Sequence, residues 1–303
     1  MGSAEAYLRG PLRRSLLVRR IAEDPTSRMA IWARRFALFA IVVVVLGILI
    51  VRAGFLEIIP SLAVLGGALI LATLAVVLAL GAFVAIWRDG LAGFGMAMTA
   101  FLIGVGLVAY PAYLGTKAYR LPAIADITTD PIDPPRFEAI ARLRQRDANP
   151  ILYAGLRAAE LQKAAYPNIQ PLILPVTPDQ AFEAAMTVMN KRKLRPVDAR
   201  PPQAGRRDGR IEVVFRTPVM GFRDDVVIRV RPDPDGARID MRSTSRYGRH
   251  DFGTNAARIA SLTDDIEDAI GAITSEKPPP DLPAKGTKKG PDPKAPKTSE
   301  KRR

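Results

Sequence analysis

An almost unbroken apolar block from Phe36 to Tyr113 constrains the fold more than any other feature of the chain. Short charged interruptions divide it into three runs, residues 36–51, 58–87 and 91–116. A helix rises about 1.5 Å per residue, so roughly twenty apolar residues cross about 30 Å of hydrocarbon. The first run reaches this length only with its flanks, whose arginines can extend to the lipid headgroups. Because no charged residue lies inside any run, we predict three transmembrane helices rather than buried helices of a soluble protein.

Small residues recur at helical spacing on the second and third runs. In lipid, helices associate through close backbone packing, which small side chains permit. We therefore expect the second and third helices to pack as an antiparallel pair. The spans also lack the ionisable residues that mark an ion or proton path, so an anchor is favoured over a channel or transporter. The small residues are Ala68, Ala72, Ala75, Ala79 and Ala82 on the second run, and Gly93, Ala97, Ala100 and Gly104 on the third.

The net charge of +14 lies mostly in the two tails. Residues 1–35 carry eight Arg against three acids, and residues 276–303 carry nine Lys or Arg against four acids. A nucleic-acid-binding domain would concentrate basic residues on its folded part, so we predict no nucleic-acid partner. The tails are typical of solvated segments or of segments attracted to anionic lipid. The Pro- and Lys-rich tail has almost no large aliphatic residues, and we predict that it is disordered.

Basic residues also predict the orientation in the membrane. Nine arginines flank one end of the three predicted helices, whereas Arg52, Lys117 and Arg120 flank the other. Positive charge stays in the cytoplasm, which predicts a cytoplasmic N-terminus, an uncleaved signal anchor and a periplasmic main domain in a bacterial inner membrane. The predicted organisation is a basic N-terminus at 1–35, a three-helix anchor at 36–116, a periplasmic domain at 117–275 and a disordered tail at 276–303.

The segment after the apolar block predicts an α+β domain with an antiparallel sheet and flanking helices. Helices are expected at 136–146, 156–165, 178–192 and from the region of Asn255 to about Ile273, and a short strand at 169–176. Three alternating runs separated by turn residues predict neighbouring antiparallel strands with one apolar face. That face consists of Ile211, Val213 and Phe215, then Val226, Ile228 and Val230, then Ala237, Ile239 and Met241.

The opposite face of these strands is charged, and two interpretations remain open. A solvated face with cross-strand ion pairs is the simpler one. A groove that binds an anion is the other. The residues concerned are Glu212, Arg216, Arg229, Arg231, Arg238, Asp240 and Arg242.

The last strand runs into the sequence RSTSRYGRHDFGTNAARI, here called the string, which spans Arg242 to Ile259. Together with DITTDPIDPPRF, AAYPNIQPL and TPVMGFRDDVVIRVRP upstream, it resembles the domain-of-unknown-function family 1499 over residues 121–274. Within the string, Ser-Arg-x-Gly-x-x-Asp-x-Gly-x-Asn-x-x-Arg-Ile is the specific pattern. The resemblance suggests a membrane-anchored alphaproteobacterial member, and it implies no reaction because the family has no established activity.

The string supplies the candidate site, for which two roles remain open. Free N–H groups at a helix start, with guanidinium groups nearby, can bind a phosphate or carboxylate ligand. The anion can also be internal, with Asp251 capping the helix and pairing with Arg246 or Arg258 as a structural lock. The candidate residues are Arg242, Ser245, Arg246, Asp251, Asn255 and Arg258.

Catalytic and metal chemistry find little support in the residues. A triad of Ser245, His250 and Asp251 is disfavoured because adjacent residues rarely orient one another, and no Gly-x-Ser-x-Gly turn is present. Asp224 and Asp225 are neighbours in a strand and should point to its opposite faces, so they cannot share a substrate. We expect them to have a turn or strand-edge role. The chain has no cysteine and one histidine, so we predict no metal or cofactor.

These observations favour a structural or binding role in the cell envelope, and lean against an enzyme. The expected partners are the lipid bilayer and an anionic envelope ligand or envelope protein. The alternative is an envelope hydrolase or transferase that acts on a phosphorylated or glycosidic substrate through the string. An enzyme should show a cavity into which Arg242, Arg246 and Asp251 converge, whereas a lock should show these groups satisfied by one another.

Overall fold

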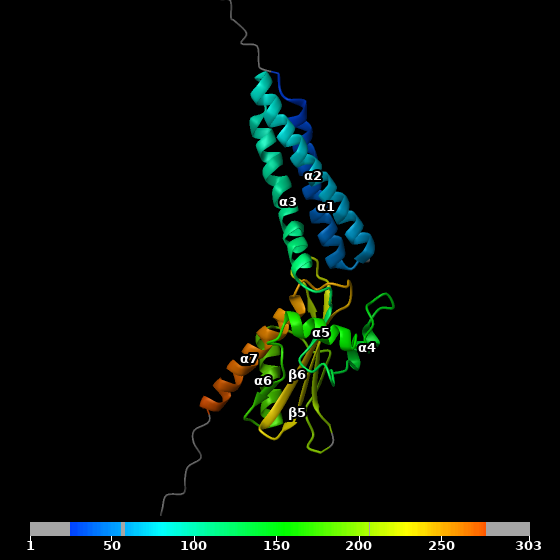
Figure 1. Cartoon of the computed structure of the whole chain (residues 1–303), viewed down its shortest axis with the longest axis vertical. Helices are drawn as coiled ribbons and strands as arrows, with labels where there is room; N and C mark the ends of the chain where they lie inside the picture. Colours follow the sequence, from blue (N-terminus) through cyan, green and yellow to red (C-terminus); the bar gives the residue numbers. More distant parts are fainter. Residues whose placement is uncertain (1–24, 56–57, 206, 277–303) are drawn as a thin grey trace, which may run out of the picture.

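The computed structural model describes residues 25–55, 58–205 and 207–276. It consists of a rod of three long helices followed by a mixed α+β domain at one end of the rod (Figure 1). The predictions for the basic residues before Pro25 and for the tail beyond Glu276 lie outside the described residues.

The rod contains α1 (Arg28–Ala53), α2 (Ile58–Asp89) and α3 (Phe94–Arg120), each long and apolar enough to cross a membrane. Ser27 caps the start of α1 by accepting a hydrogen bond from the Ala30 N–H. Gly54 ends the same helix in the left-handed conformation, with φ of 80°. All three helices end beyond their predicted runs and α1 also begins earlier, because flanking residues continue the helical hydrogen bonding, whereas α3 begins only at Phe94.

The small residues pack where the helix backbones approach. The predicted alanines of α2, together with Ala97 and Ala100 of α3, are fully buried. A Cβ built at Gly104 would lie 2.9 Å from the Ala72 carbonyl oxygen, so glycine permits this contact. The predicted pairing of α2 with α3 is confirmed. In addition, α1 contributes an alanine stripe of its own, Ala30, Ala33, Ala37 and Ala40, which the sequence analysis missed.

The domain is built on a six-stranded antiparallel sheet with the order β1-β6-β5-β4-β3, in which β2 also pairs with β6. The three alternating runs form its centre, as predicted. The strands are β1 (Asp126–Thr128), β2 (Leu172–Leu174), β3 (Asp198–Arg200), β4 (Gly209–Arg216), β5 (Arg223–Asp233) and β6 (Gly236–Ser245).

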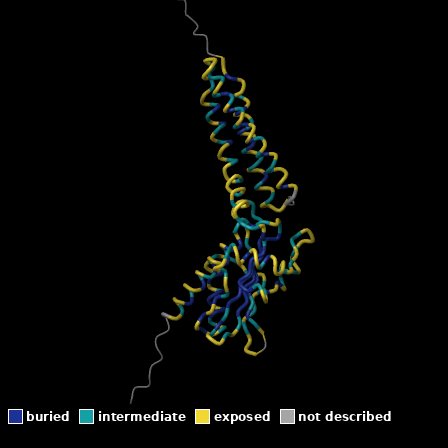
Figure 2. Tube along the Cα trace, in the orientation of Figure 1, coloured by how far each residue is buried: buried dark blue, intermediate teal, exposed yellow. Residues whose placement is uncertain are grey.

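One face of the sheet packs on α6 (Pro178–Lys191) and α7 (Thr254–Glu276), and we call it the helix face. The predicted apolar side chains from Ile211 to Met241 are fully buried there, apart from Phe215, which is partly buried (Figure 2). The sequence Thr177-Pro178-Asp179-Gln180 starts α6 with a capping box, in which side chain and backbone satisfy each other.

The segment 126–153 begins with the edge strand β1 and then, with α4 (Ala139–Leu143), crosses over the other face, which we call the charged face. Next along the chain, Gln162 of α5 (Leu156–Ala165) hydrogen-bonds both backbone groups of Thr128 and extends the edge of β1.

Two predicted elements are shorter than expected. The strand predicted at 169–176 is confined to β2, because Pro171 and Pro175 cannot donate backbone hydrogen bonds on either side. The helix predicted at 136–146 is confined to α4, because Arg144 takes an extended conformation and turns its side chain toward Asp225 and Asn149.

Candidate functional site

The structure divides the string between the two faces of the sheet. Arg242 on β6 and Arg246 just beyond it point to the charged face, where they pair with Asp126 and Asp225. Ser245, Asn255 and Arg258 meet on the helix face. The six candidate residues therefore do not converge on one cavity.

Arg242 is buried within a complete set of partners. Its Nε and Nη2 atoms donate to the two carboxylate oxygens of Asp126 at 2.9 and 2.6 Å. The same guanidinium donates to the carbonyl oxygens of Pro135 and Ile151, and lies 5.1 Å from the Phe137 ring centroid. A bidentate pair with stacking uses the planar geometry of arginine fully. Each of the three guanidinium nitrogens therefore donates to an acceptor of the chain itself.

Arg246 is held in the same manner. Its Nε and Nη2 atoms donate to Oδ1 of Asp225 at 2.9 and 2.8 Å. Arg144 donates its Nε to Oδ2 of the same carboxylate at 2.7 Å. Asp225 is fully buried, so one carboxylate balances two guanidinium groups inside the protein.

On the helix face, Asn255 is the centre of a buried hydrogen-bond network. Its Oδ1 accepts from the Ser243 hydroxyl at 2.7 Å, and its Nδ2 donates to Ser245 Oγ and to the Ala125 carbonyl, both at 3.0 Å. Arg258 donates to the same Oδ1 and, through Nη2, to Asp224 at 2.5 Å. These contacts join β6, the segment before β1 and the first turns of α7.

Asp251 caps the start of α7, as expected. Its carboxylate accepts from the backbone N–H groups of Gly253 at 3.0 Å and Asn255 at 2.8 Å. The expected pairing with Arg246 or Arg258 is wrong, because Asp225 and Asp224 already occupy these arginines. Burial raises the pKa of Asp251 above its usual value, while the two backbone donors oppose the rise.

The interpretation of the charged face as solvated is also wrong, although a cross-strand ion pair of the expected kind joins Arg229 and Asp240. Glu212 and Asp240 are fully buried, because the segment 126–153 covers them. Oε1 of Glu212 accepts from the backbone N–H groups of Glu138 and Ala139, and Oε2 from Ile140, so this carboxylate caps α4.

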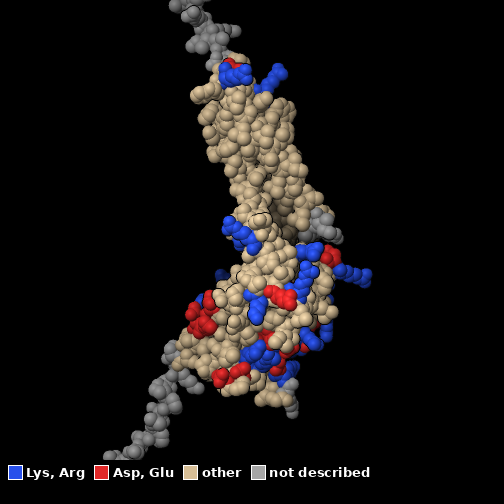
Figure 3. All heavy atoms as spheres, in the orientation of Figure 1, with Lys and Arg blue, Asp and Glu red and all other residues tan. Residues whose placement is uncertain are grey.

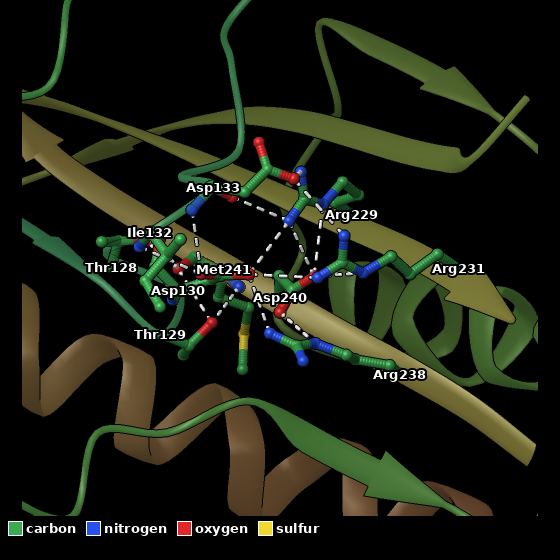
Figure 4. A network of polar contacts seen from close by, with 10 residues as sticks. All are labelled: Thr128, Thr129, Asp130, Ile132, Asp133, Arg229, Arg231, Arg238, Asp240 and Met241. Carbon is green, nitrogen blue, oxygen red and sulfur yellow. Dashed lines mark hydrogen bonds and ion pairs between the residues drawn. The ribbon is translucent and has the colours of Figure 1, made fainter. Parts of the chain in front are cut away.

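A second ion network fills the rest of the charged face (Figure 4). Asp240 lies among the guanidinium groups of Arg229, Arg231 and Arg238, at 2.9, 3.1 and 2.8 Å. Asp130 pairs with the latter two at 3.0 and 2.8 Å. Burial tends to raise the pKa of Asp130, but the Asp133 backbone N–H and the nearby arginines hold it below its usual value. The chain's own carboxylates therefore occupy the groove considered for an external anion.

The Ser–His–Asp arrangement is not assembled. Nε2 of His250 lies 3.1 Å from the Leu121 carbonyl, and its Nδ1 accepts the Phe252 N–H. Asp224 and Asp225 point to opposite faces as expected, and each is held in a buried ion pair. Within residues 25–55, 58–205 and 207–276, no three His, Asp or Glu side chains are grouped to hold a metal ion.

A cavity of about 720 Å³ lies beside the string. Its wall includes Asp126, Tyr153, Arg157 and Arg249, with apolar residues between them. Burial raises the pKa of Tyr153 to about 12, the Asp126 carboxylate adds to the rise and Arg242 opposes it. The volume of this cavity falls within the range of small-ligand sites.

Sequence patterns did not identify the acidic partners of the sheet's arginines. Asp126, Asp130, Asp133 and Glu138 lie in one short segment, and each pairs with arginines of the sheet. The available signal was charge complementarity: an acidic segment precedes strands whose polar face has an excess of arginine.

Comparison with known families gives one match. A family model described as Protein of unknown function (DUF1499) matches residues 126–266. Comparisons with curated proteins and with solved structures give no match.

Proposed function

We propose that this chain, whose residues 126–266 form a domain of the DUF1499 family, anchors that domain in a bacterial inner membrane for a structural or binding role. The three apolar helices support attachment to a membrane. Lys and Arg lie at both ends of the apolar rod and are absent between them on the face in view (Figure 3).

The excess of basic residues at the end that carries Arg28, Arg34, Arg35 and Arg88 supports a cytoplasmic N-terminus. With three crossings, the DUF1499 domain is then periplasmic. An envelope location of the alphaproteobacterial anchored type follows from this orientation and from the resemblance described above.

A structural or binding role rests on one observation, the closed pairing of the string. A catalytic arginine or carboxylate must contact substrate, yet Arg242, Arg246 and Arg258 each bind a buried carboxylate of the chain. The hydrolase or transferase alternative receives no support from this arrangement. The neighbouring cavity has Arg157 and Arg249 in its wall. It supports a binding role, because these arginines can bind an anionic envelope ligand.

Fusions test the proposed orientation. Alkaline phosphatase placed after Ser275 should be active in a bacterial host, because it folds only outside the cytoplasm. The matched control is the same fusion after Asp89, at the C-terminal end of α2. This end lies on the proposed cytoplasmic side, so the control should be inactive. Activity from the Asp89 fusion alone would reverse the orientation.

Urea unfolding of the isolated domain, residues 121–276, tests the closed pairing. Phosphate should not raise the midpoint through Arg242, Arg246 or Arg258, because each of these arginines already binds a buried carboxylate. The control is Asp126→Ala, which leaves Arg242 without its carboxylate partner. Phosphate should stabilise this variant. Stabilisation by phosphate that persists after Arg157→Gln and Arg249→Gln, which remove the arginines of the neighbouring cavity, would favour an anion site at the paired arginines.

A further inference from the structure

A cavity of about 680 Å³ separates the end of α1 from the membrane-facing edge of the domain. It is distinct from the cavity beside the string. The residues that line it are Val51, Arg52, Ala53, Gly54 and Phe55 of α1 and the following turn, Gln145 and Asp147, Arg216 of β4, Gly221, Phe222 and Arg223 at the start of β5, and Tyr247.

The sheet places like charges opposite each other at this cavity. In the register of β4 and β5, Arg216 is the direct partner of Arg223. Like charges in directly opposed positions are destabilising unless an anion lies between them. Neither guanidinium has a carboxylate partner in the part of the chain that the structure describes.

Every other arginine pair in register in this sheet has a carboxylate from the chain. Arg200 and Arg210 share Glu138. Arg229, opposite Arg210, binds Asp240, and the opposed Arg231 and Arg238 share Asp130. The pair at the cavity therefore differs from the others, because no described carboxylate of the chain lies between its guanidinium groups.

A third guanidinium faces the same space. Arg52 lies in the last turn of α1, and its Nη1 donates to the carbonyl oxygens of Pro218 and Val219 at 2.7 and 3.2 Å. These bonds fix it beside the β4–β5 loop, and no carboxylate among the described residues pairs with it. Asp147 is the one acidic residue in the lining described here.

The cavity also lies at the level where the apolar spans end. Arg52 terminates the α1 span, and the adjoining loop 217–222 contains Pro218, Val219, Met220 and Phe222. Phe55 is 84% exposed and Val219 is 41% exposed. Apolar and aromatic side chains beside arginines are typical of the membrane interface.

We infer that this cavity binds the phosphate group of an anionic phospholipid, with Arg52, Arg216 and Arg223 as its guanidinium donors. Arginine suits a phosphate because its planar donors match the oxygens. The bilayer is the source of the phosphate, because the loop beside the donors presents apolar side chains where acyl chains begin. This inference rests on the proposed membrane attachment and adds a lipid partner to it.

The full chain in nanodiscs with equal parts of phosphatidylcholine and phosphatidylglycerol tests the inference. Lipids that remain bound after release from the discs are counted by native mass spectrometry. The wild type should retain phosphatidylglycerol preferentially, and Arg216→Gln with Arg223→Gln should reduce that preference roughly tenfold. The control replaces Arg136 and Arg195 with Gln, because both are exposed and lie outside the cavity lining.

Two competition experiments distinguish a phospholipid from a free phosphate as the bound ligand. Inorganic phosphate and glycerophosphoglycerol, added at millimolar concentration, should not displace the bound lipid. Displacement by inorganic phosphate, or equal retention by the wild type and the Arg216/Arg223 variant, would overturn the inference. Near-ultraviolet circular dichroism of each variant confirms that the domain is folded. Failure of the alkaline phosphatase fusion would overturn the periplasmic placement separately, because nanodiscs present both faces to the same lipid.

Discussion

The two faces of the domain's sheet are both buried, yet different interactions hold them. On the helix face, apolar side chains such as Ile228 and Met241 pack against α6 and α7. On the charged face, buried carboxylates such as Asp225 and Asp240 pair with arginines beneath the segment 126–153. Apolar packing tolerates partial loss of contact, whereas a buried charge without its partner retains its full desolvation cost.

This difference implies distinct responses to substitution. Loss of one carboxylate on the charged face leaves guanidinium groups unpaired, and loss of one aliphatic side chain on the helix face leaves a cavity. The stability predictions below use urea unfolding of the isolated domain, residues 121–276.

The largest effect is expected for Asp225→Ala on the charged face. Arg144 and Arg246 would both lose their carboxylate in a buried site, which should lower the free energy of unfolding by roughly 3–5 kcal/mol. The matched control is Asp133→Ala, because the Asp133 side chain is 57% exposed and its loss should have a small effect. Equal effects of the two substitutions would contradict the importance of burial on this face.

Replacement of Asp225, Arg144 and Arg246 together, by Leu, Met and Met, sharpens the comparison. The triple variant should recover much of the stability that Asp225→Ala loses, because no buried charge remains unpaired. If stability is not recovered, the ion pairs contribute to folding beyond neutralising one another's buried charge.

The next effect is expected on the helix face. Leu262 of α7 is fully buried, and Leu262→Ala should lower the free energy of unfolding by roughly 2–4 kcal/mol through lost burial and a residual cavity. Leu143→Ala is the control, because that side chain is 58% exposed. The loss at Leu262 should be nearly independent of pH between about 5 and 8; a strong pH dependence would indicate coupling to the charged groups.

A smaller effect should distinguish Asp130 from Asp251 by pH. The pKa of Asp130 is lowered, so its contribution is present above the unfolded pKa of about 3.9 and is lost as pH falls through the folded value. The pKa of Asp251 is raised because burial makes its ionisation less favourable in the folded than in the unfolded state, so the protein gains stability as pH falls through the folded value. Compared with Asp→Asn variants, the wild type should lose relative stability at acidic pH for Asp130 and gain it for Asp251. Slopes of the same sign would contradict these environments.

The smallest effect is expected at the rim of the charged face. The side chains of Arg200 and Glu138 are 38% and 44% exposed, so water screens their ion pair. Arg200→Gln should change the free energy of unfolding by less than about 0.5 kcal/mol. A change above about 1 kcal/mol would extend the buried network to this edge of the sheet.

Much of the fold could be predicted from the sequence. The three apolar helices, the small-residue packing of α2 with α3 and the apolar face of the central strands follow from local patterns that one segment contains by itself. The cap at Asp251 was predictable for the same reason, because it bonds residues only two and four positions away.

The candidate site could be predicted only in part, because its partners are distant in the chain. The sequence identifies Arg242 and Arg246 as unusual, but the positions of Asp126 and Asp225 relative to them depend on how β1 and β5 align with β6. Several acidic residues could pair with each arginine, and charge alone does not identify which of them does. The alternating pattern likewise identifies the polar face without indicating what covers it.

The sequence by itself determined the elements that a local pattern of residues identifies: long apolar helices, alternating strands and the capped starts of α6 and α7. The tertiary structure alone decided that the polar face is buried, which acid joins which arginine, and that Arg216 and Arg223 face each other with no described carboxylate between them. Hydrophobic periodicity is a local property, because the backbone repeat fixes it. Charge pairing is a property of register and packing, because it depends on distances between segments that the sequence does not state.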